Sequence, residues 1–398
     1  MAPVTGYRAQ PDAEADAAFA VSRLRLNDFR SYHSLHLDIG PEPVVLTGPN
    51  GAGKTNILEA LSYLSPGRGL RRARLGDVTR HGHAGGWAVS ARVYDAATGT
   101  ASDIGTGTAD AAAPDGAAER RLVRIDGQAG RGPASLAEVL SLSWLTPRMD
   151  RLFQDEAPSR RRFLDRLLYG VDAQHARRVS AYERALRERA RLLKTGEGNA
   201  AWLGALEETM AAHGVAVAAA RRDGVARLAQ GLAAADGPFP AAALAVVGTL
   251  ESWLDTLAAV EAETRFRIEL ERSRGRDAET GGAALGPHRS DLAVTHLATG
   301  LPAQQCSTGE QKALLIAIVL ADARVKAVQG GVVPLLLLDE VVAHLDAGRR
   351  EALFGQILDL GAQAWLTGTD REMFAPMVGS AQYLGVAESR VNPDGGIP

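Results

Sequence analysis

The sequence predicts an α/β fold in which a head, built from both ends of the chain, is interrupted by an inserted, mostly helical second lobe. An apolar strand, a glycine-rich loop and a helical pattern follow one another between residues 44 and 64, and the apolar run Val332–Leu338 predicts another buried strand. Between these segments, residues 148–280 are rich in Arg, Ala, Leu and Glu with helical periodicity. The 398 residues also exceed the roughly 250–300 at which a single core stops growing.

These patterns divide the chain into four expected segments. They are a loose N-terminal tail (1–20), the first part of the head (21–147), the helical lobe (148–280) and the second part of the head (281–398). Within the first part, the Gly/Ala/Asp-rich stretch Ala96–Gly116 predicts a mobile loop. Glycines at 196, 198, 204, 214 and 224 interrupt the helical lobe, which argues against long coiled-coil arms.

Composition limits the classes of protein to consider. With 46% hydrophobic and 23% charged residues, the chain is typical of globular proteins. Its apolar runs fall short of the roughly 20 residues needed to span a bilayer, and the N-terminus lacks the pattern of a secretory signal, so we expect a cytoplasmic protein with no membrane contact. One cysteine excludes an internal disulfide framework. A net charge of −3 leaves room only for local basic surfaces.

A phosphate-binding loop is predicted between the strand Val44–Leu46 and the helical pattern that includes Ile57–Leu64. Every fixed position of the Walker A pattern is matched by Gly48, Pro49, Asn50, Gly51, Ala52, Gly53, Lys54 and Thr55. Backbone N–H groups and the helix N-terminus attract phosphate, Lys54 reaches the β- and γ-phosphates, and Thr55 ligates magnesium. The sequence therefore predicts ATP and Mg²⁺ as ligands.

A Walker B element is predicted where Val332–Leu338 ends at two carboxylates. Asp339 is expected to hold Mg²⁺, and Glu340 to polarise the attacking water as general base. The alternative is an ordinary core strand followed by two charged residues. A Walker A element in the same chain favours the Walker B interpretation.

A signature loop of the ABC type is predicted shortly before Walker B. Ser307, Gly309 and Gln311 match the register of that loop, whose serine and glycine contact the γ-phosphate held by a partner subunit. The alternative is a helix N-terminus capped by Ser307 or Thr308. A functional signature would sandwich each ATP between two chains, so ATP binding and homodimer formation would be one equilibrium. These elements together predict a P-loop ATPase head of the ABC type.

Two further segments follow Walker B. Ala343–Asp346 resembles the D-loop that crosses the dimer interface of such heads. A short strand then ends at Thr367–Asp370, where transporter-type heads place a switch histidine, and this chain has none there. Thr367 and Asp370 are candidates for sensing the γ-phosphate, and we assign neither a catalytic role.

The flanking segments resemble the RecF family, in order from about Leu24 to Asp370. The segments that carry this resemblance are Asn27–Tyr32, Thr55–Ala60, Thr146–Pro147, Arg160–Asp165 and Leu285–Leu292. His344, where an acidic D-loop residue is expected, and the N-terminal extension 1–20 depart from the family pattern.

The resemblance implies a two-lobed head related to SMC ATPases without their arms. It also implies ATP-dependent dimerisation, weak DNA-stimulated ATP hydrolysis, and work with RecO and RecR in loading recombinase at gaps. Recombinational repair, replication and the SOS response are the expected settings.

Arginine clusters are the candidate DNA contacts. Four arginines lie in a glycine-containing loop after the phosphate-loop helix, namely Arg68, Arg71, Arg72 and Arg74. A second cluster includes Arg160–Arg162, Arg166, Arg177 and Arg178, where nearby acidic residues favour internal pairing. For both clusters, a solvated charge run remains the alternative. Because aromatics make up only 5% of the chain, backbone contact to duplex or gapped DNA and junctions is favoured over base stacking.

Two other functions share some of these motifs. An ABC transporter also carries Walker and signature elements, but the missing switch histidine and the arginine-rich insert disfavour it. An ABC-ATPase-linked nuclease of the overcoming-lysogenisation type needs an acidic cluster after the ATPase elements, and none is evident in the sequence.

Overall fold

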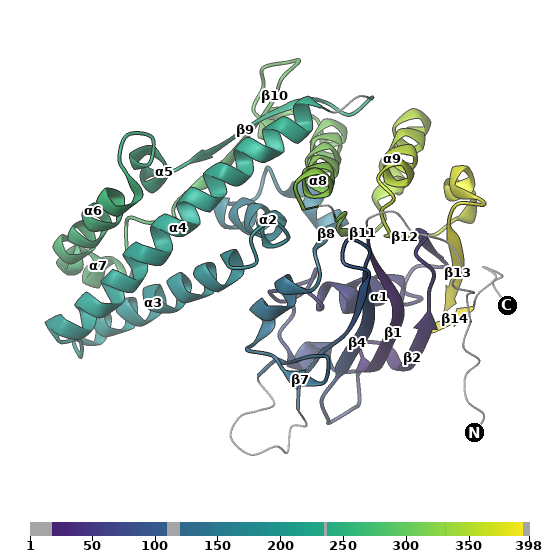
Figure 1. Ribbon diagram of the computed structural model, residues 1–398, viewed down its shortest axis with the longest axis horizontal. Helices are drawn as coiled ribbons and strands as arrows, with labels where there is room; N and C mark the ends of the chain where they lie inside the picture. The colour runs from purple at the N-terminus through teal and green to yellow at the C-terminus, as the bar shows by residue number, and fades with distance from the viewer. Residues whose placement is uncertain (1–17, 110–119, 235–236, 331, 393–398) are drawn as a thin grey trace. The chain divides into compact units, whose positions relative to one another are not determined.

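The structure is a computed structural model that describes residues 18–109, 120–234, 237–330 and 332–392 (Figure 1). It divides into two compact units. The head unit comprises the described residues of Met1–Asp150, Asp236–Phe239 and Leu315–Pro398, and the helical unit comprises those of Arg151–Ala235 and Pro240–Leu314. Among the described residues, no helix combines the length and apolar character needed to cross a membrane.

The first sheet of the head unit is mainly parallel and contains the two strands that precede the Walker elements. Its strands, in spatial order, are β14 (Arg390–Asn392), β13 (Gln382–Ala387), β3 (Val44–Thr47), β12 (Ala364–Gly368), β11 (Leu335–Leu338) and β8 (Leu142–Leu145). All pairs are parallel except β13 with β14. Strands β3, β12, β11 and β8 are buried along their whole length, as is typical of parallel strands, which explains the apolar runs Val44–Leu46 and Leu335–Leu338.

The second sheet of the head unit is antiparallel. Its strands, in spatial order, are β2 (Tyr32–Asp38), β1 (Phe19–Phe29), β4 (Ala88–Asp95), β5 (Thr100–Gly107), β6 (Leu122–Ile125) and β7 (Gln128–Ala129). Helix α1 (Lys54–Ser62) packs against β1 of this sheet and β12 of the other. The shared core includes an edge-to-face cluster in which the ring centroids of Phe29, Tyr63 and Trp87 lie 5.0–5.9 Å apart.

Helices α8 (Thr308–Gly330) and α9 (Ala347–Asp359) lie on the other face of the parallel sheet (Figure 1), where Arg324 of α8 donates to Gln356 of α9 (2.6 Å). Leu142 and Trp144 of β8 belong to the core that contains α1, so Ser143 between them points the opposite way. Its hydroxyl donates to Asp322 of α8 (2.9 Å), and that carboxylate is paired with Lys326 (2.6 Å). Short 3-10 helices connect the elements: η1 (Gly76–Val78), η3 (Pro133–Glu138), η4 (Pro147–Arg151), η5 (Ala303–Gln305), η6 (Val341–His344) and η7 (Arg371–Met377).

The helical unit contains six helices and one strand pair among its described residues. They are α2 (Ala157–Tyr169), α3 (His175–Thr195), α4 (Ala200–Ala233), α5 (Thr249–Trp253), α6 (Ala259–Arg272) and α7 (Arg274–Thr280), with β9 (Ala242–Val247) antiparallel to β10 (Asp291–His296). Helices α3 and α4 lie side by side (Figure 1), and α6 also packs on α4. Tyr182, Met210 and Phe266 are among the side chains of the resulting core.

Three of the five glycines that were expected to interrupt this lobe do not break a helix. Gly204, Gly214 and Gly224 lie inside the continuous helix α4. A Cβ at Gly224 would meet Leu168 of α2 at 2.1 Å, and one at Gly214 would meet Phe266 of α6 at 2.9 Å. Glycine at these two sites therefore permits close packing of α4 against its neighbours and does not break the helix.

Three expected boundaries differ from the structure. The tail expected at 1–20 ends earlier, because Phe19 and Ala20 belong to β1 and Ala18 bridges to Val333, while residues 1–17 lie outside the described range. The loop expected at Ala96–Gly116 contains β5, which pairs with β4 over its full length; residues 110–119 are not described. The helical lobe expected at 148–280 extends to 314, because β10 pairs with β9 and so joins this unit rather than the head.

Candidate nucleotide-binding site

The phosphate loop has a backbone shape that only glycine can provide at its two ends. Gly48, after β3, has φ 149°, and a Cβ there would lie 2.0 Å from the carbonyl oxygen of Val386. Gly53, with φ 114°, precedes α1, and a Cβ there would lie 2.7 Å from the hydroxyl of Tyr32. Val386 of β13 and Tyr32 of β2 therefore contact the two ends of the loop. The loop leads directly into the N-terminus of α1, where backbone N–H groups can bind phosphate.

Lys54 is buried within this loop. Its ammonium group donates hydrogen bonds to the carbonyl oxygens of Gly48 (2.5 Å) and Pro49 (2.9 Å). Burial lowers the pKa of Lys54, and the negative charges of Glu340 and Asp339 act in the opposite direction. Lys54 therefore lies within the loop, and Glu340 and Asp339 are close enough to affect its pKa.

Asp339 follows β11 and is hydrogen-bonded from two directions. Its Oδ1 accepts from the hydroxyl of Thr55 at the start of α1 (2.9 Å) and from the hydroxyl of Thr367 at the end of β12 (2.8 Å). Burial raises the pKa of Asp339, while both hydroxyls lower it. The hydroxyl of Thr55 beside the carboxylate forms a set of hard oxygen ligands that fits Mg²⁺, which proteins hold through few side chains plus substrate phosphates.

Glu340 has an unusual backbone conformation. It is half-buried and left-handed, with φ 51° and ψ 24°, and it precedes η6. Its backbone N–H donates to the hydroxyl of Thr367 (2.8 Å). The sequence analysis gave Thr367 only as a candidate for sensing the γ-phosphate, whereas its hydroxyl contacts the two acidic residues that follow β11. By contrast, Asp370 is exposed and accepts from the backbone N–H of Glu372 (2.8 Å).

The predicted signature residues lie in the helical unit and open α8. Ser307 and Glu310 form a capping box: the Ser307 hydroxyl accepts from the Glu310 N–H (3.3 Å), and the Glu310 carboxylate accepts from the Ser307 N–H (2.8 Å). Gln311 is buried and donates to the Cys306 carbonyl oxygen (2.8 Å). Gly309 is exposed, and a Cβ there would meet no atom within 4 Å. The capping alternative therefore describes the local geometry, in which the exposed Ser307 also donates its hydroxyl proton to the Glu310 carboxylate (2.8 Å).

The last two residues of the segment expected to form a D-loop, Leu345 and Asp346, contact the rest of the head unit. Leu345 is buried, and the exposed Asp346 caps α9 by accepting from the Arg349 N–H (2.8 Å). His344 belongs to η6, and its side chain lies outside what the structure describes.

The four loop arginines predicted to contact DNA do not share one environment. Arg71 is committed to internal contacts, because it donates to the fully buried carboxylate of Glu59 (2.9 Å) and to Asn56 (2.8 Å) on α1. Arg30 also pairs with Glu59 (2.6 Å). The buried carboxylate needs cationic partners, which is the physical reason that Arg71 differs from the others. The exposed members of the cluster are Arg68, Arg72 and Arg74.

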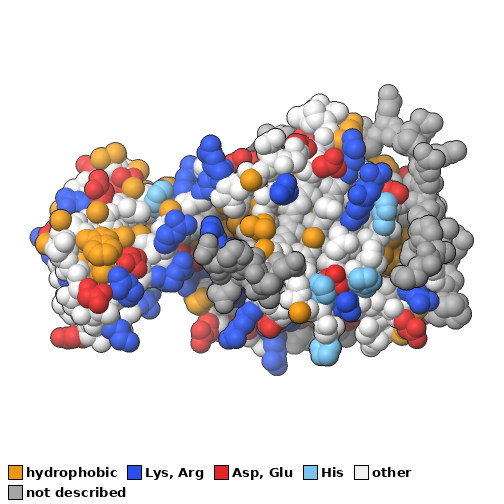
Figure 2. All heavy atoms as spheres, turned by 90° about the horizontal axis from the view of Figure 1, so that it is seen from below, with side chains coloured by type: hydrophobic (Ala, Val, Ile, Leu, Met, Phe, Trp, Pro, Cys, Tyr) orange, Lys and Arg blue, Asp and Glu red, His pale blue; other side chains and the backbone are white. Residues whose placement is uncertain are grey.

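The second arginine cluster is largely used inside the helical unit. Arg160 forms two hydrogen bonds with Asp291 (2.7 Å each), Arg161 donates to the Ser290 carbonyl oxygen (2.6 Å), and Arg178 pairs with Asp172. On the face drawn in Figure 2, lysine and arginine side chains are interspersed with acidic and uncharged ones. On this face, phosphate binding would therefore depend on local clusters.

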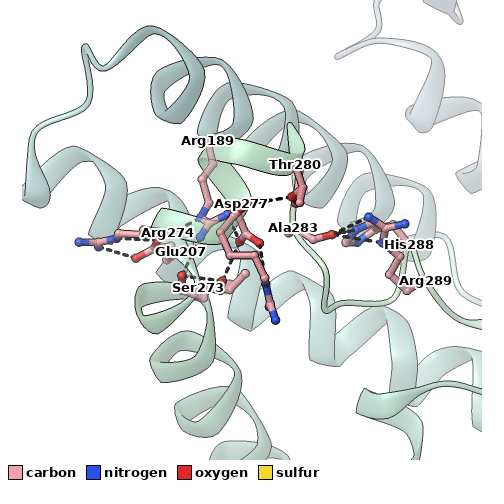
Figure 3. A network of polar contacts seen from close by, with 12 residues as sticks. Arg189, Glu207, Ser273, Arg274, Asp277, Thr280, Ala283, His288 and Arg289 are labelled. Carbon is pink, nitrogen blue, oxygen red and sulfur yellow. Dashed lines mark hydrogen bonds and ion pairs between the residues drawn. The ribbon is translucent and has the colours of Figure 1, made fainter.

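Buried polar networks organise the helical unit near its family-like segment (Figure 3). The ring of His288 receives a hydrogen bond from Tyr182 (2.6 Å) and donates one to the Ala283 carbonyl oxygen (2.9 Å), to which Arg289 also donates (3.0 Å). Burial lowers the pKa of His288 to about 4. A neighbouring cluster pairs Arg189 with Glu207 (3.0 Å) and Asp277 (2.9 Å). His288 and Arg289 therefore have internal structural contacts.

The chain is similar to known proteins over almost its whole length. The RecF/RecN/SMC N terminal domain family matches residues 20–391. "DNA replication and repair protein RecF" of Mesorhizobium japonicum is 47% identical over 375 residues, covering 94% of this chain and 97% of that relative. Its counterpart from Brucella suis biovar 1 is 47% identical over 374 residues, covering 94% of this chain and 96% of the relative.

Solved structures show the same fold. The recombination mediator protein RecF-ATPrS in the RecFOR pathway matches with a TM-score of 0.79 at 19% identity, covering 96% of this chain and 99% of that one. An Smc head domain from Pyrococcus furiosus, bound to the C-terminal domain of ScpA, matches with a TM-score of 0.52 at 14% identity, covering 94% of this chain and 95% of that one. The α/β head of ABC-type ATPases predicted from the sequence is therefore confirmed.

Proposed function

The chain belongs to the RecF family, and from this premise we propose that it is an ATP-dependent DNA-binding protein of replication and repair. ATP binding pairs two copies of the chain, the pair grips DNA, and hydrolysis of ATP releases it. The observation that carries this proposal is the cluster of Lys54, Thr55, Asp339 and Glu340 around the phosphate loop.

Each residue of this cluster has a chemical role in the proposal. Backbone N–H groups of the loop and the N-terminus of α1 attract the phosphates of ATP, and Lys54 contacts the β- and γ-phosphates. Thr55 and Asp339 hold Mg²⁺, which neutralises phosphate charge when bound. Glu340 orients and polarises the attacking water as general base. The family is that of ABC-type ATPases, so hydrolysis is the expected reaction, slow and stimulated by DNA.

The signature residues complete the site of a second copy. Ser307 and Gly309 are exposed at the start of the 23-residue helix α8, so the N-terminus of this helix can face a phosphate on another chain. The Ser307 hydroxyl would contact that phosphate by exchanging its hydrogen bond to the Glu310 carboxylate. Gln311 supports the loop through its bond to Cys306. In this arrangement ATP stabilises the homodimer because it binds more tightly where both chains contribute contacts.

Exposed arginines are the proposed DNA contacts. Arg68, Arg72 and Arg74 present guanidinium groups that suit phosphate oxygens, whereas Arg71 is reserved for Glu59. Duplex DNA at gaps or single-strand junctions is the proposed substrate. RecR and RecO are proposed as partners because the RecF relative of known structure acts in the RecFOR pathway. The cytoplasm is the proposed location.

The other functions considered from the sequence are not supported. Relatives named for DNA replication and repair align over 94% of the chain, and the family match spans residues 20–391, which include both Walker elements and the inserted lobe. A transporter subunit or an ATPase-linked nuclease does not fit that alignment.

Two variants separate nucleotide binding from hydrolysis. Lys54→Ala should lose ATP affinity and ATP-dependent dimerisation, because the loop loses its cationic contact to the phosphates. Glu340→Gln should bind ATP and dimerise but hydrolyse at least roughly 100-fold more slowly, as expected for loss of a general base. Binding of labelled ATP, particle mass and phosphate release report these steps separately. Equal dimerisation of wild type and Lys54→Ala would reject the nucleotide-dependent dimer.

A further inference from the structure

We propose that Thr367 is a positioning residue for hydrolysis, whose hydroxyl holds Asp339 and Glu340 in the arrangement that the reaction requires. This inference rests on the proposed ATPase function. It adds a residue at the strand end where transporter-type heads carry a histidine.

The position of Thr367 follows from the sheet. Strand β12 lies between β3, which leads into the phosphate loop, and β11, which leads into the acidic pair. Leu366 is in register with both Val45 and Leu338, so the next residue of β12 lies beside Asp339. Thr367 is only 1% exposed, so water does not compete freely for its hydroxyl.

The Thr367 hydroxyl accepts one hydrogen bond and donates another. It accepts a hydrogen bond from the N–H of Glu340 (2.8 Å), which can only donate. Its single proton is then donated to Oδ1 of Asp339 (2.8 Å). One hydroxyl thus links the backbone of the proposed general base to the side chain of the proposed magnesium ligand. Because its proton is committed, Thr367 is not arranged as a γ-phosphate sensor.

The backbone of Glu340 gives this link its importance. With φ 51°, Glu340 has a left-handed backbone conformation that residues other than glycine rarely adopt. Such a residue persists only where its surroundings hold it in place. The bond from its N–H to Thr367 is a restraint from the neighbouring strand. Loss of the hydroxyl would release the peptide that carries the base, and small displacements of reacting groups have large effects on rate.

The test compares Thr367→Val, which removes the hydroxyl and keeps the branched shape, with Thr367→Ser, which keeps the hydroxyl. Single-turnover hydrolysis and ATP affinity are measured on the full chain, with wild type and Glu340→Gln as references. Thr106→Val is the matched control. Thr106 is also a buried threonine of the head unit, whose hydroxyl donates to the Leu122 carbonyl oxygen (2.9 Å) and accepts from Arg121 (2.8 Å).

The valine variant is expected to hydrolyse bound ATP roughly 10- to 100-fold more slowly, with ATP affinity within about threefold of wild type. Thr367→Ser and Thr106→Val should stay within about threefold of the wild-type rate. Thr367→Ala provides a second variant without the hydroxyl should the valine variant not fold, and it should be slowed to the same degree.

Several outcomes would overturn the proposal. Near wild-type hydrolysis by Thr367→Val or Thr367→Ala would refute the positioning role alone, because the wild type would still be an ATPase that depends on Glu340. Equal slowing of Thr367→Ser and Thr367→Val would show that the hydroxyl is not responsible. Failure of wild type to hydrolyse any ATP would overturn the proposed function together with this inference.

Discussion

Replacing Asp165 by Asn should strongly destabilise the helical unit, because this buried carboxylate is the partner of two side chains, Arg221 and His175. Both of its oxygens accept from Arg221 of α4 (2.8 Å each), and Oδ1 is also 2.9 Å from the ring of His175. Arg221 donates in addition to the carbonyl oxygen of Pro287 (2.6 Å). The side chains of Arg221 and Asp165 are only 5% and 6% exposed, so an arginine left without its carboxylate cannot be rehydrated.

The magnitude follows from this burial. Removing one partner of a buried ion pair leaves an uncompensated charge and costs about 3–5 kcal/mol in the free energy of unfolding. Asp172→Asn is the matched control. Asp172 pairs with Arg178, but their side chains are 29% and 33% exposed, so water can replace the lost partner. Loss of that pair should cost about 0–1 kcal/mol.

The same carboxylate predicts a dependence of stability on pH. Burial alone would raise the pKa of Asp165, but the charge and hydrogen bonds of Arg221, together with His175, bring it below its ordinary value. Its contribution to stability is therefore present above the unfolded pKa of about 3.9 and is lost as the pH falls below that value. The difference between wild type and Asp165→Asn should shrink in that acidic range.

Hydrogen exchange of α2 and α4 amides, together with urea unfolding, measures these effects in the unit concerned. The expected result is a large loss of protection in both helices for Asp165→Asn and little change for Asp172→Asn. A cost below about 1 kcal/mol for Asp165→Asn, or an equal cost for both variants, would refute the reasoning from burial.

Two further predictions concern the head unit. Gly48→Ala should abolish ATP binding, because its Cβ would lie 2.0 Å from the Val386 carbonyl oxygen at a φ of 149°. ATP affinity is measured by titration, and an affinity equal to that of wild type would contradict this account of the loop. Charge reversal at Arg72 and Arg74 should weaken DNA binding by at least about tenfold and flatten its salt dependence, whereas Arg92→Glu, at another exposed arginine of the head unit, should have little effect. Equal losses for the two sets, measured by fluorescence anisotropy across salt concentrations, would argue against a local DNA surface.

The sequence predicted the parts of the site that depend on local patterns. The phosphate loop lies between β3 and α1, and the acidic pair follows β11, because apolar runs and glycine spacing are properties of neighbouring residues. The presence of both Walker elements also predicted that distant segments meet, and the bond between Thr55 and Asp339 joins them.

Features that depend on distant partners could not be predicted in the same way. Arg71 reads as one of four similar loop arginines, and only the buried Glu59 distinguishes it from the others. Gly224 reads as a helix breaker until Leu168 is found where its side chain would lie. Thr367 was predicted only as a candidate γ-phosphate sensor, because its two partners follow the neighbouring strand β11 and cannot be found from the local sequence. In each case a long-range contact outweighs local propensity.

The central claim is that ATP closes two chains around DNA. The most direct measurement is the binding of Glu340→Gln to gapped duplex DNA with and without ATP and Mg²⁺, with particle mass recorded on the same samples. The account predicts tight DNA binding only with ATP and Mg²⁺, rising in parallel with the dimer and absent when Lys54→Ala is also introduced. DNA binding by the monomer that is equally tight without nucleotide would contradict it.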